Sequence, residues 1–198
     1  MLAILFFIKI STKYESIMNV LKEDILKTYR LASGGKLKKI ISCYRTPGVH
    51  AITNVRFGQW IKKQNILIKL LLQPFYYLQF YLIRTRWGIE IPAATQIGKG
   101  FYIGHFGGII ISPHTIIGKN VNISQQVTIG VSGEGEKRGV PIIGNNVYIA
   151  PGAKIFGKIT IGNNVKIGAN AVVYKNVPND ATVVLDPGMK ILIKDTSK

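Results

Sequence analysis

Residues 143–177 read IGNNVYIAPGAKIFGKITIGNNVKIGANAVVYKNV, and an isoleucine or valine recurs at every sixth position of this stretch. The recurring residues are Ile143, Ile149, Ile155, Ile161, Ile167 and Val173. A helix has a period of about 3.6 and a strand a period of 2, so neither explains a strict six. A six-residue repeat is typical of a parallel β-helix, in which each hexad forms one side of a triangular coil of about 18 residues.

The same spacing extends toward the N-terminus. Ile91, Ile97, Ile103 and Ile109 are six apart, an eight-residue step leads to Ile117, Ile123 and Ile129, and a fourteen-residue step leads to Ile143. We expect the eight-residue step at a corner formed by Ser112-Pro113-His114. The eight surplus residues of the longer step fall in VSGEGEKRGVP, residues 131–141, which we expect to be an extruded loop because glycine and charged residues dominate it. The series makes a little over four coils, enough to bury a continuous core.

The sequence therefore predicts a mainly β fold with three parts. A helical, basic region covers residues 1–88, a parallel β-helix covers residues 89–180, and a tail covers residues 181–198. Helices are expected at Glu15–Leu31, Lys36–Tyr44 and His50–Lys63, and in the apolar run at 66–83, with Ser33-Gly34-Gly35 ending the first.

The charge is strongly asymmetric. The chain has a formal net charge of +17, and residues 1–89 hold 15 Lys and Arg against 3 Asp and Glu. A solvated basic surface, an anionic membrane face or an anionic substrate each accounts for this excess. No nucleic-acid-binding motif is recognisable, so we expect no nucleic acid partner.

Two apolar segments bear on the compartment. Residues 1–10, MLAILFFIKI, lack the basic start and the cleavage site of a signal peptide, and Met18 opens an ordinary helix, so we expect residues 1–17 to be dispensable. Residues 66–83 are near the lower limit for a membrane span and contain Lys69 and Pro74, so we expect internal packing first, contact with a membrane surface second and a true span last. Cys43 is the only cysteine, which excludes disulfides and suits a cytoplasmic protein, and we expect a buried thiol.

Histidine is the residue type here with the best chemistry for proton transfer. His105 lies in Gly-His-Phe-Gly-Gly and takes an outward slot of its hexad, where it is either a general base or a surface residue without a role. Glu90, fifteen residues earlier, could orient its imidazole or simply be a solvated acid. His114 is a second substrate contact or a structural corner residue, and His50 a packing residue. The six-residue spacing does not bring three histidines of one subunit together, so we expect no zinc site.

Several motifs resemble a known family over roughly residues 20–190. They are Pro47-Gly48-Val49-His50-Ala51-Ile52, Arg56-Phe57-Gly58 with Trp60, Gly98-Lys99-Gly100, the rung from Ile103 to Gly108, Ile143-Gly144, and Pro151-Gly152-Ala153-Lys154-Ile155. Together they resemble serine acetyltransferases and their polysaccharide O-acetyltransferase relatives.

The resemblance implies a left-handed β-helix, a homotrimer with active sites between subunits, and acetyl-CoA as donor with no metal. His105 matches the catalytic histidine and Glu90 its acidic partner, while backbone N–H groups would stabilise the oxyanion. The acceptor contacts implied are His114 and Arg138. The acetyl-CoA contacts implied are Gly130, Ala150, Gly152, Lys154, Gly168, Ala169 and Lys190.

The departures from the family bear on the acceptor. Serine acetyltransferases carry Asp-His where this chain has Gly104-His105, and Arg-His-Pro where it has Arg138-Gly139-Val140-Pro141. A site that lacks partners for the polar groups of serine discriminates poorly for it. We therefore expect an O-acetyltransferase acting on a sugar of a surface polysaccharide or its precursor, in the cytoplasm and at the inner face of the membrane. The alternatives are a true serine acetyltransferase of cysteine biosynthesis and a non-catalytic trimeric scaffold.

Overall fold

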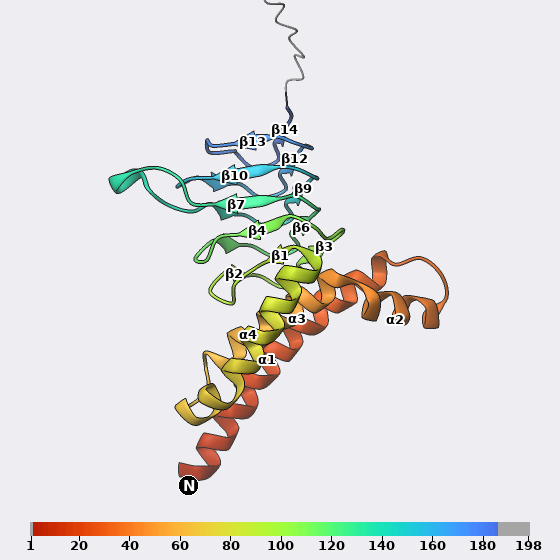
Figure 1. Ribbon diagram of the computed structural model, residues 1–198, viewed down its shortest axis with the longest axis vertical. Coiled ribbons are helices and arrows are strands. Elements are labelled where there is room, and N and C mark those ends of the chain that lie inside the picture. The colour runs from red at the N-terminus through yellow and green to blue at the C-terminus, as the bar shows by residue number, and fades with distance from the viewer. Residues whose placement is uncertain (1, 186–198) are drawn as a thin grey trace, which may run out of the picture.

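Four helices precede the strands in the computed structural model, which describes residues 2–185, with side chains from residue 17 onward (Figure 1). The helices are α1 (Leu2–Leu31), α2 (Lys36–Arg45), α3 (Pro47–Ile61) and α4 (Ile66–Trp87). α1 begins well before the predicted Glu15, because no proline or glycine interrupts residues 2–32. α3 begins at Pro47 rather than His50, since proline is well suited to the first helical position.

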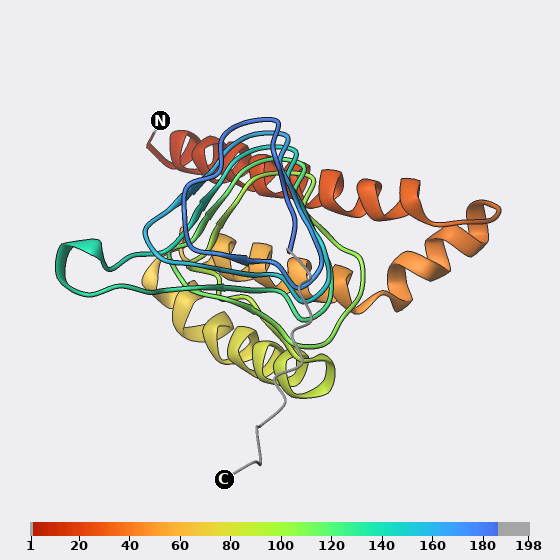
Figure 2. The ribbon, with the colours of Figure 1, turned by 90° about the horizontal axis from the view of Figure 1, so that it is seen from above.

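The strands wind into a left-handed parallel β-helix, as the family resemblance implies, and its triangular section is plain in Figure 2. Sheet 1 holds β1 (Ile89–Glu90), β4 (Ile109–Ile111), β7 (Thr128–Gly130), β10 (Lys154–Phe156) and β13 (Val172–Val173). Sheet 2 holds β2 (Gln96–Ile97), β5 (Ile116–Ile117), β8 (Ile142–Ile143) and β11 (Thr160–Ile161). Sheet 3 holds β3 (Tyr102–Ile103), β6 (Asn122–Ile123), β9 (Tyr148–Ile149), β12 (Lys166–Ile167) and β14 (Thr182–Val183).

The repeating isoleucines fill the centre of the coil. Ile129, Ile149, Ile155, Ile161 and Ile167 are fully buried. The second apolar position of each hexad joins the same core, through residues such as Val121, Val127, Val147, Ala153 and Val165. Each aliphatic side chain thus stacks on its equivalent in the next coil, and the stack holds the sheets together.

Strand register corrects one prediction. Ile111 pairs with Ile129 and Ile103 with Ile123, so the eight-residue step runs from Ile103 to Ile111 and not through Pro113. Ile109 is buried as well, which is why spacing alone selects the wrong isoleucine. The two surplus residues therefore lie between His105 and Gly108.

The longer insertion and the end of the coil are also defined by register. Ile117 pairs with Ile143 and Ile143 with Ile161, so one coil carries the eight extra residues expected, and they project as a loop containing the short helix η1 (Gly135–Lys137) (Figure 2). The loop ends are joined by reciprocal backbone hydrogen bonds between Ser132 and Gly139. β14 pairs with β12, so the coil continues past the predicted end at residue 180.

A buried ion pair joins the helices to the first coil. Asp24 of α1 accepts a hydrogen bond from Arg56 Nε of α3 at 2.9 Å and another from the backbone N–H of Phe101 at 2.9 Å. The remaining Arg56 nitrogens donate to the carbonyl oxygens of Ile97 at 2.6 Å and Gly98 at 2.8 Å. Burial raises the pKa of Asp24, and the charge of Arg56 opposes that rise. We call this network the Asp24–Arg56 clamp.

α4 is the one helix, within the described residues, that is long and apolar enough to cross a membrane, yet only 11% of its most apolar window is buried. Internal packing, the interpretation that the sequence favours most, therefore covers only a small part of this helix.

The clamp generates a stability prediction. Asp24→Ala should lower the free energy of unfolding by about 3–5 kcal/mol, because it leaves the Arg56 guanidinium buried without a counter-charge. Urea unfolding followed by circular dichroism measures this. Glu23→Ala, which removes the same charge from the preceding position, should cost under about 1 kcal/mol. Equal losses in the two variants would show that the ion pair has no special role.

Candidate active site

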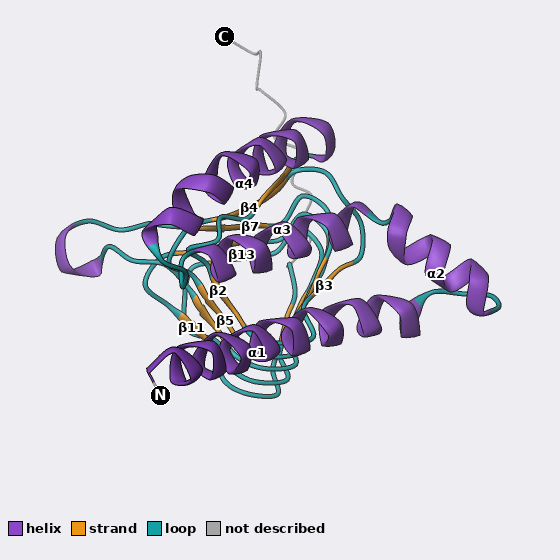
Figure 3. Cartoon of the chain, turned by 90° about the horizontal axis from the view of Figure 1, so that it is seen from below, coloured by secondary structure: helices purple, strands orange, loops and turns teal. Residues whose placement is uncertain are grey.

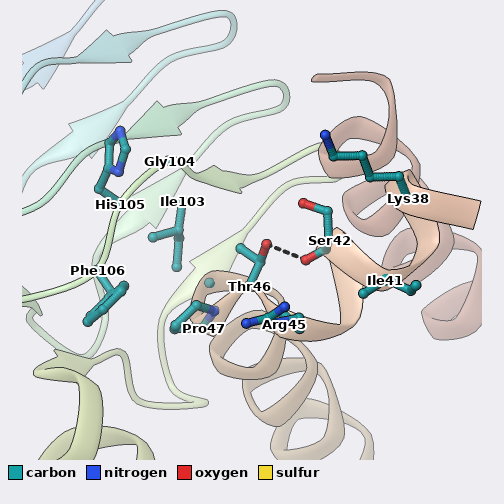
Figure 4. A pocket seen from close by; sticks show the side chains of 11 residues that line it. Lys38, Ile41, Ser42, Arg45, Thr46, Pro47, Ile103, Gly104, His105 and Phe106 are labelled. Carbon is teal, nitrogen blue, oxygen red and sulfur yellow. Dashed lines mark hydrogen bonds between the residues drawn. The ribbon is translucent and has the colours of Figure 1, made fainter. Parts of the chain in front are cut away.

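His105 lies on an exposed corner of the coil between sheets 3 and 1. The two surplus residues widen this corner, and Gly107 and Gly108 follow with positive φ angles of 103° and 66°, a conformation that glycine adopts without strain. Figure 4 shows the imidazole pointing away from the inward Ile103. The outward position predicted for His105 is therefore the one observed. We call the column of corners between sheets 3 and 1 the histidine edge (residues 104–108, 124–127, 150–153 and 168–171).

A cavity of about 390 Å³ opens beside His105. Its β-helix wall consists of Ile103, Gly104, His105 and Phe106, and the facing wall comes from α2 and the start of α3 (Figure 4). That second wall contributes Lys38, Ile41, Ser42, Arg45, Thr46, Pro47 and Gly48. Among the described residues, two cations and two hydroxyl groups line the cavity, and no carboxylate does.

Gly48 allows α3 to approach the histidine edge closely. A Cβ atom at this position would lie 2.7 Å from Ile103 Cβ and 2.8 Å from the Ile103 carbonyl oxygen. Gly104 differs, because a Cβ there would meet nothing nearer than Tyr102 Cε1 at 3.4 Å, which is ordinary contact. The cavity wall is therefore tight behind Ile103 and has room for a side chain at residue 104.

Glu90 lies in β1, one layer below Ile110, and is half-buried. Over the described residues, no hydrogen bond or ion pair joins its carboxylate to His105. Its role as the partner of the histidine therefore stays a prediction.

The residues implied as acetyl-CoA contacts mostly gather on one edge. Ala150 and Gly152 form the corner two layers above His105, and Gly168 and Ala169 form the next one. Lys154 begins β10 beside this column, and its amine donates to Thr128 Oγ1 at 3.2 Å and to the Gln126 carbonyl. Gly130 lies at the far end of sheet 1, and Lys190 lies outside the described residues.

His114 and Arg138 lie elsewhere in the subunit. Both occupy corners between sheets 1 and 2, His114 below the projecting loop and Arg138 within it, whereas His105 is at the other end of sheet 1. His114 has a φ of 69°, the left-handed conformation that other corners such as Asn120 and Asn146 also adopt. One subunit therefore does not bring the two proposed acceptor residues to His105.

His50 and Cys43, the other residues considered from the sequence, have surroundings that suit a structural role. His50 stacks on Trp87 with ring centroids 5.2 Å apart, and its Nε2 lies 2.6 Å from the Tyr44 carbonyl, in agreement with a packing role. Cys43 is buried, and burial raises the pKa of its thiol. No group of three metal-ligating side chains occurs in the part of the chain that the structure describes.

Sequence reasoning missed Lys38 and Arg45 as site residues. One signal was available: residues 25–89 contain twelve Lys and Arg and no Asp or Glu. The cations of this segment therefore have no counter-charge within it when they line a cavity. A counter-charge has to come from a neighbouring segment, as Asp24 provides for Arg56.

Comparison with known proteins identifies the relatives of this chain. Residues 141–175 match the family described as bacterial transferase hexapeptide (six repeats). A serine acetyltransferase of Helicobacter pylori is 37% identical over 141 residues, which are 70% of this chain and 77% of that protein. One from Synechococcus elongatus is 37% identical over 154 residues, 77% of this chain and 59% of that protein.

Solved structures agree in fold. The crystal structure of serine acetyltransferase isoform 3 of Entamoeba histolytica in complex with cysteine superposes with a TM-score of 0.74 at 28% identity, covering 94% of this chain and 64% of that one. The serine acetyltransferase of Neisseria gonorrhoeae in complex with serine gives 0.71 at 27% identity, covering 87% and 68%. The chain thus spans about three fifths to three quarters of the length of these relatives.

The close approach at Gly48 generates a prediction. Gly48→Ala should lower the free energy of unfolding by about 1–3 kcal/mol, because its methyl group must displace Ile103 or its backbone. Gly104→Ala is the matched control and should change the stability by under about 1 kcal/mol, since its Cβ has room. Urea denaturation of both variants decides the matter, and a Gly48→Ala protein as stable as the Gly104→Ala protein would contradict the described packing.

Proposed function

The chain belongs to the serine acetyltransferase family, and from this membership we propose that it is an O-acetyltransferase that uses acetyl-CoA. The observation that carries the proposal is the position of His105, exposed beside a cavity and in one column with the small-residue corners that would receive the donor. Acetyl-CoA supplies the acetyl group as an activated thioester. The non-catalytic scaffold is the less favoured alternative, because it leaves this arrangement unexplained.

His105 acts as the general base. Its imidazole accepts the proton of the acceptor hydroxyl while that oxygen forms the new ester bond, and the proton then passes to the departing thiolate. Backbone N–H groups of the corners would stabilise the oxyanion that forms on the thioester carbonyl. Glu90 would hold the imidazole in the required orientation. Because its carboxylate makes no bond to His105 in the described structure, it would first have to move to the ring, for example when substrate binds.

The donor would lie along the histidine edge. Ala150, Gly152, Gly168 and Ala169 have small side chains, which leaves the corners low enough for an extended ligand to rest on the coil. Lys154 is placed to exchange its bond to the Gln126 carbonyl for a contact with a donor phosphate. Gly130 and Lys190 remain proposed contacts, the former through a neighbouring subunit.

A homotrimer would complete the site. Within one subunit, the projecting loop with Arg138 and the corner with His114 are separated from His105 by the width of sheet 1. We propose that in a threefold assembly the edge that carries the projecting loop would face the histidine edge of the next subunit, which would bring Arg138 to the acceptor. The single cysteine suits a reducing compartment, and we propose a cytoplasmic enzyme.

Two acceptors are supported by different observations. Serine is favoured by the relatives, since the proteins compared are named serine acetyltransferases and one is solved with serine. A sugar hydroxyl is favoured by the part of the cavity that one subunit forms: Lys38 and Arg45 could meet the carboxylate of serine, but none of the described lining residues is a carboxylate that could receive its ammonium group. A buried or half-buried ammonium without such a partner is costly to bind.

The catalytic proposal is tested by thiol release from acetyl-CoA with serine, homoserine and a panel of sugars as acceptors. His105→Ala should reduce the rate by roughly 10²–10⁴-fold while leaving the unfolding curve unchanged, because the side chain is exposed. Lys119→Ala, which removes an exposed side chain at a corner between sheets 2 and 3 that the proposed reaction does not use, is the control and should leave the rate unchanged. Equal rates for His105→Ala and the unmodified protein would exclude His105 as the base.

The acceptor is tested by introducing a carboxylate at residue 104, where serine acetyltransferases carry Asp. Gly104→Asp should raise kcat/KM for serine by roughly tenfold or more, because a hydrogen bond to a charged group contributes about 1.5–3 kcal/mol. Gly104→Ala has the same backbone change without the charge and should not show the gain. Efficient use of serine and no use of sugars by the unmodified protein would instead establish serine as the acceptor.

A further inference from the structure

α4 exposes a large apolar surface that the proposed reaction does not use. Nine of its large apolar residues are exposed: Ile66, Leu67, Leu70, Leu71, Phe75, Tyr77, Leu78, Tyr81 and Leu82. Only Tyr76 and Ile83 of this helix are buried. Contiguous exposed apolar surface of this kind usually marks a contact with a partner or a membrane. We call these nine residues the α4 apolar face.

The opposite side of α4 is fixed to the rest of the protein. The Tyr76 hydroxyl accepts a hydrogen bond from the Ala93 N–H at 3.1 Å, and Ile83 belongs to the main core. The Asn65 side chain caps the start of the helix by accepting from the Ile68 N–H at 3.0 Å. A helix held along one side in this way presents its other side outward and is not free to cross a bilayer by itself.

Cations border the apolar face at both ends. Lys62 and Lys63 lie in the turn that precedes the helix, and Arg84 and Arg86 lie in its last turn, all of them exposed. No Asp or Glu occurs anywhere between residues 25 and 89. The face is therefore apolar at its centre and positive at its ends, with no negative charge in this segment to offset it.

We propose that the α4 apolar face docks the protein onto the surface of an anionic lipid bilayer, with α4 lying in the plane of the interface. Its apolar side chains enter the acyl boundary, and the four flanking cations meet lipid phosphates. A two-fold contact of this face with the same face of a second copy fits less well, because it would bring the same cations together. α4 lies at the first-coil end of the β-helix, away from β13 and β14, so docking leaves the C-terminal coils of the histidine edge free (Figure 1). Seen from below, α4 runs along the outside of the molecule beside α3 (Figure 3).

Vesicle flotation with the full chain tests the proposal. The protein should float with vesicles of phosphatidylcholine and phosphatidylglycerol, and much less with phosphatidylcholine alone. Leu71→Glu and Leu78→Glu should each weaken binding by roughly tenfold or more, because each places a charge where docking would bury an aliphatic side chain in the lipid. Leu31→Glu makes the same substitution at an exposed leucine outside α4 and should bind as the unmodified protein does. Arg84→Gln with Arg86→Gln should reduce binding to the anionic vesicles and make it less dependent on salt, because only two of the four flanking cations remain.

Each other outcome overturns the proposal. Absence of flotation, or equal flotation of Leu71→Glu and Leu31→Glu, removes the lipid surface as the occupant. A fall in mass of Leu71→Glu by light scattering without vesicles, in a variant that melts like the unmodified protein, assigns the face to a second copy. Resistance of the bound protein to carbonate extraction would indicate a spanning helix. Thiol release is measured in parallel and should be unchanged in Leu71→Glu, so failure here is distinct from failure of the proposed reaction.

Discussion

The hydrogen-bond register of the parallel coil is the constraint on which the rest of the structure depends. Each strand donates to and accepts from the strand one coil below, so every side of the triangle must return to the same height with its aliphatic residue inward. Surplus residues cannot be absorbed in a side and are extruded at a corner. The chain has two such insertions before its C-terminal coil, and they produce the widened corner at His105 and the projecting loop with Arg138.

The Asp24–Arg56 clamp closes the first coil and orients the helices. Because Arg56 donates to the carbonyls of Ile97 and Gly98, it satisfies backbone acceptors that have no coil beneath them. The same contact holds α3 against the coil, and the close approach at Gly48 carries α2 to the side of His105. The cavity beside the histidine is thus a consequence of how the open end of the coil is capped.

Much of this arrangement can be predicted from the sequence, and the rest has physical reasons for being hidden. A period of six identifies the coil, the loop and the outward slot of His105, since these follow from spacing alone. Ile109 and Ile111 are equally hydrophobic, so the sequence does not show which of them belongs to the six-residue repeat. Only the strand pairing identifies Ile111 as the repeat position. Asp24 belongs to no periodic pattern, and its partners are more than 30 residues away, so the clamp has no local signal. Lys38 and Arg45 line the cavity only because the helices fold back onto the third sheet.

The division of candidate residues between two edges of the coil has a direct consequence for catalysis. His105 and the proposed donor contacts lie on one edge, and Arg138 lies on a loop that projects from another, so the proposed reaction requires two copies of the chain for one active site. The most direct test is thiol release by hybrid oligomers formed from His105→Ala subunits and subunits in which residues 132–139 are excised, which removes the eight residues that this coil carries beyond a regular coil of 18. The account predicts that each parent is nearly inactive and that the hybrid regains activity. Hybrids that assemble but are no more active than either parent would contradict it.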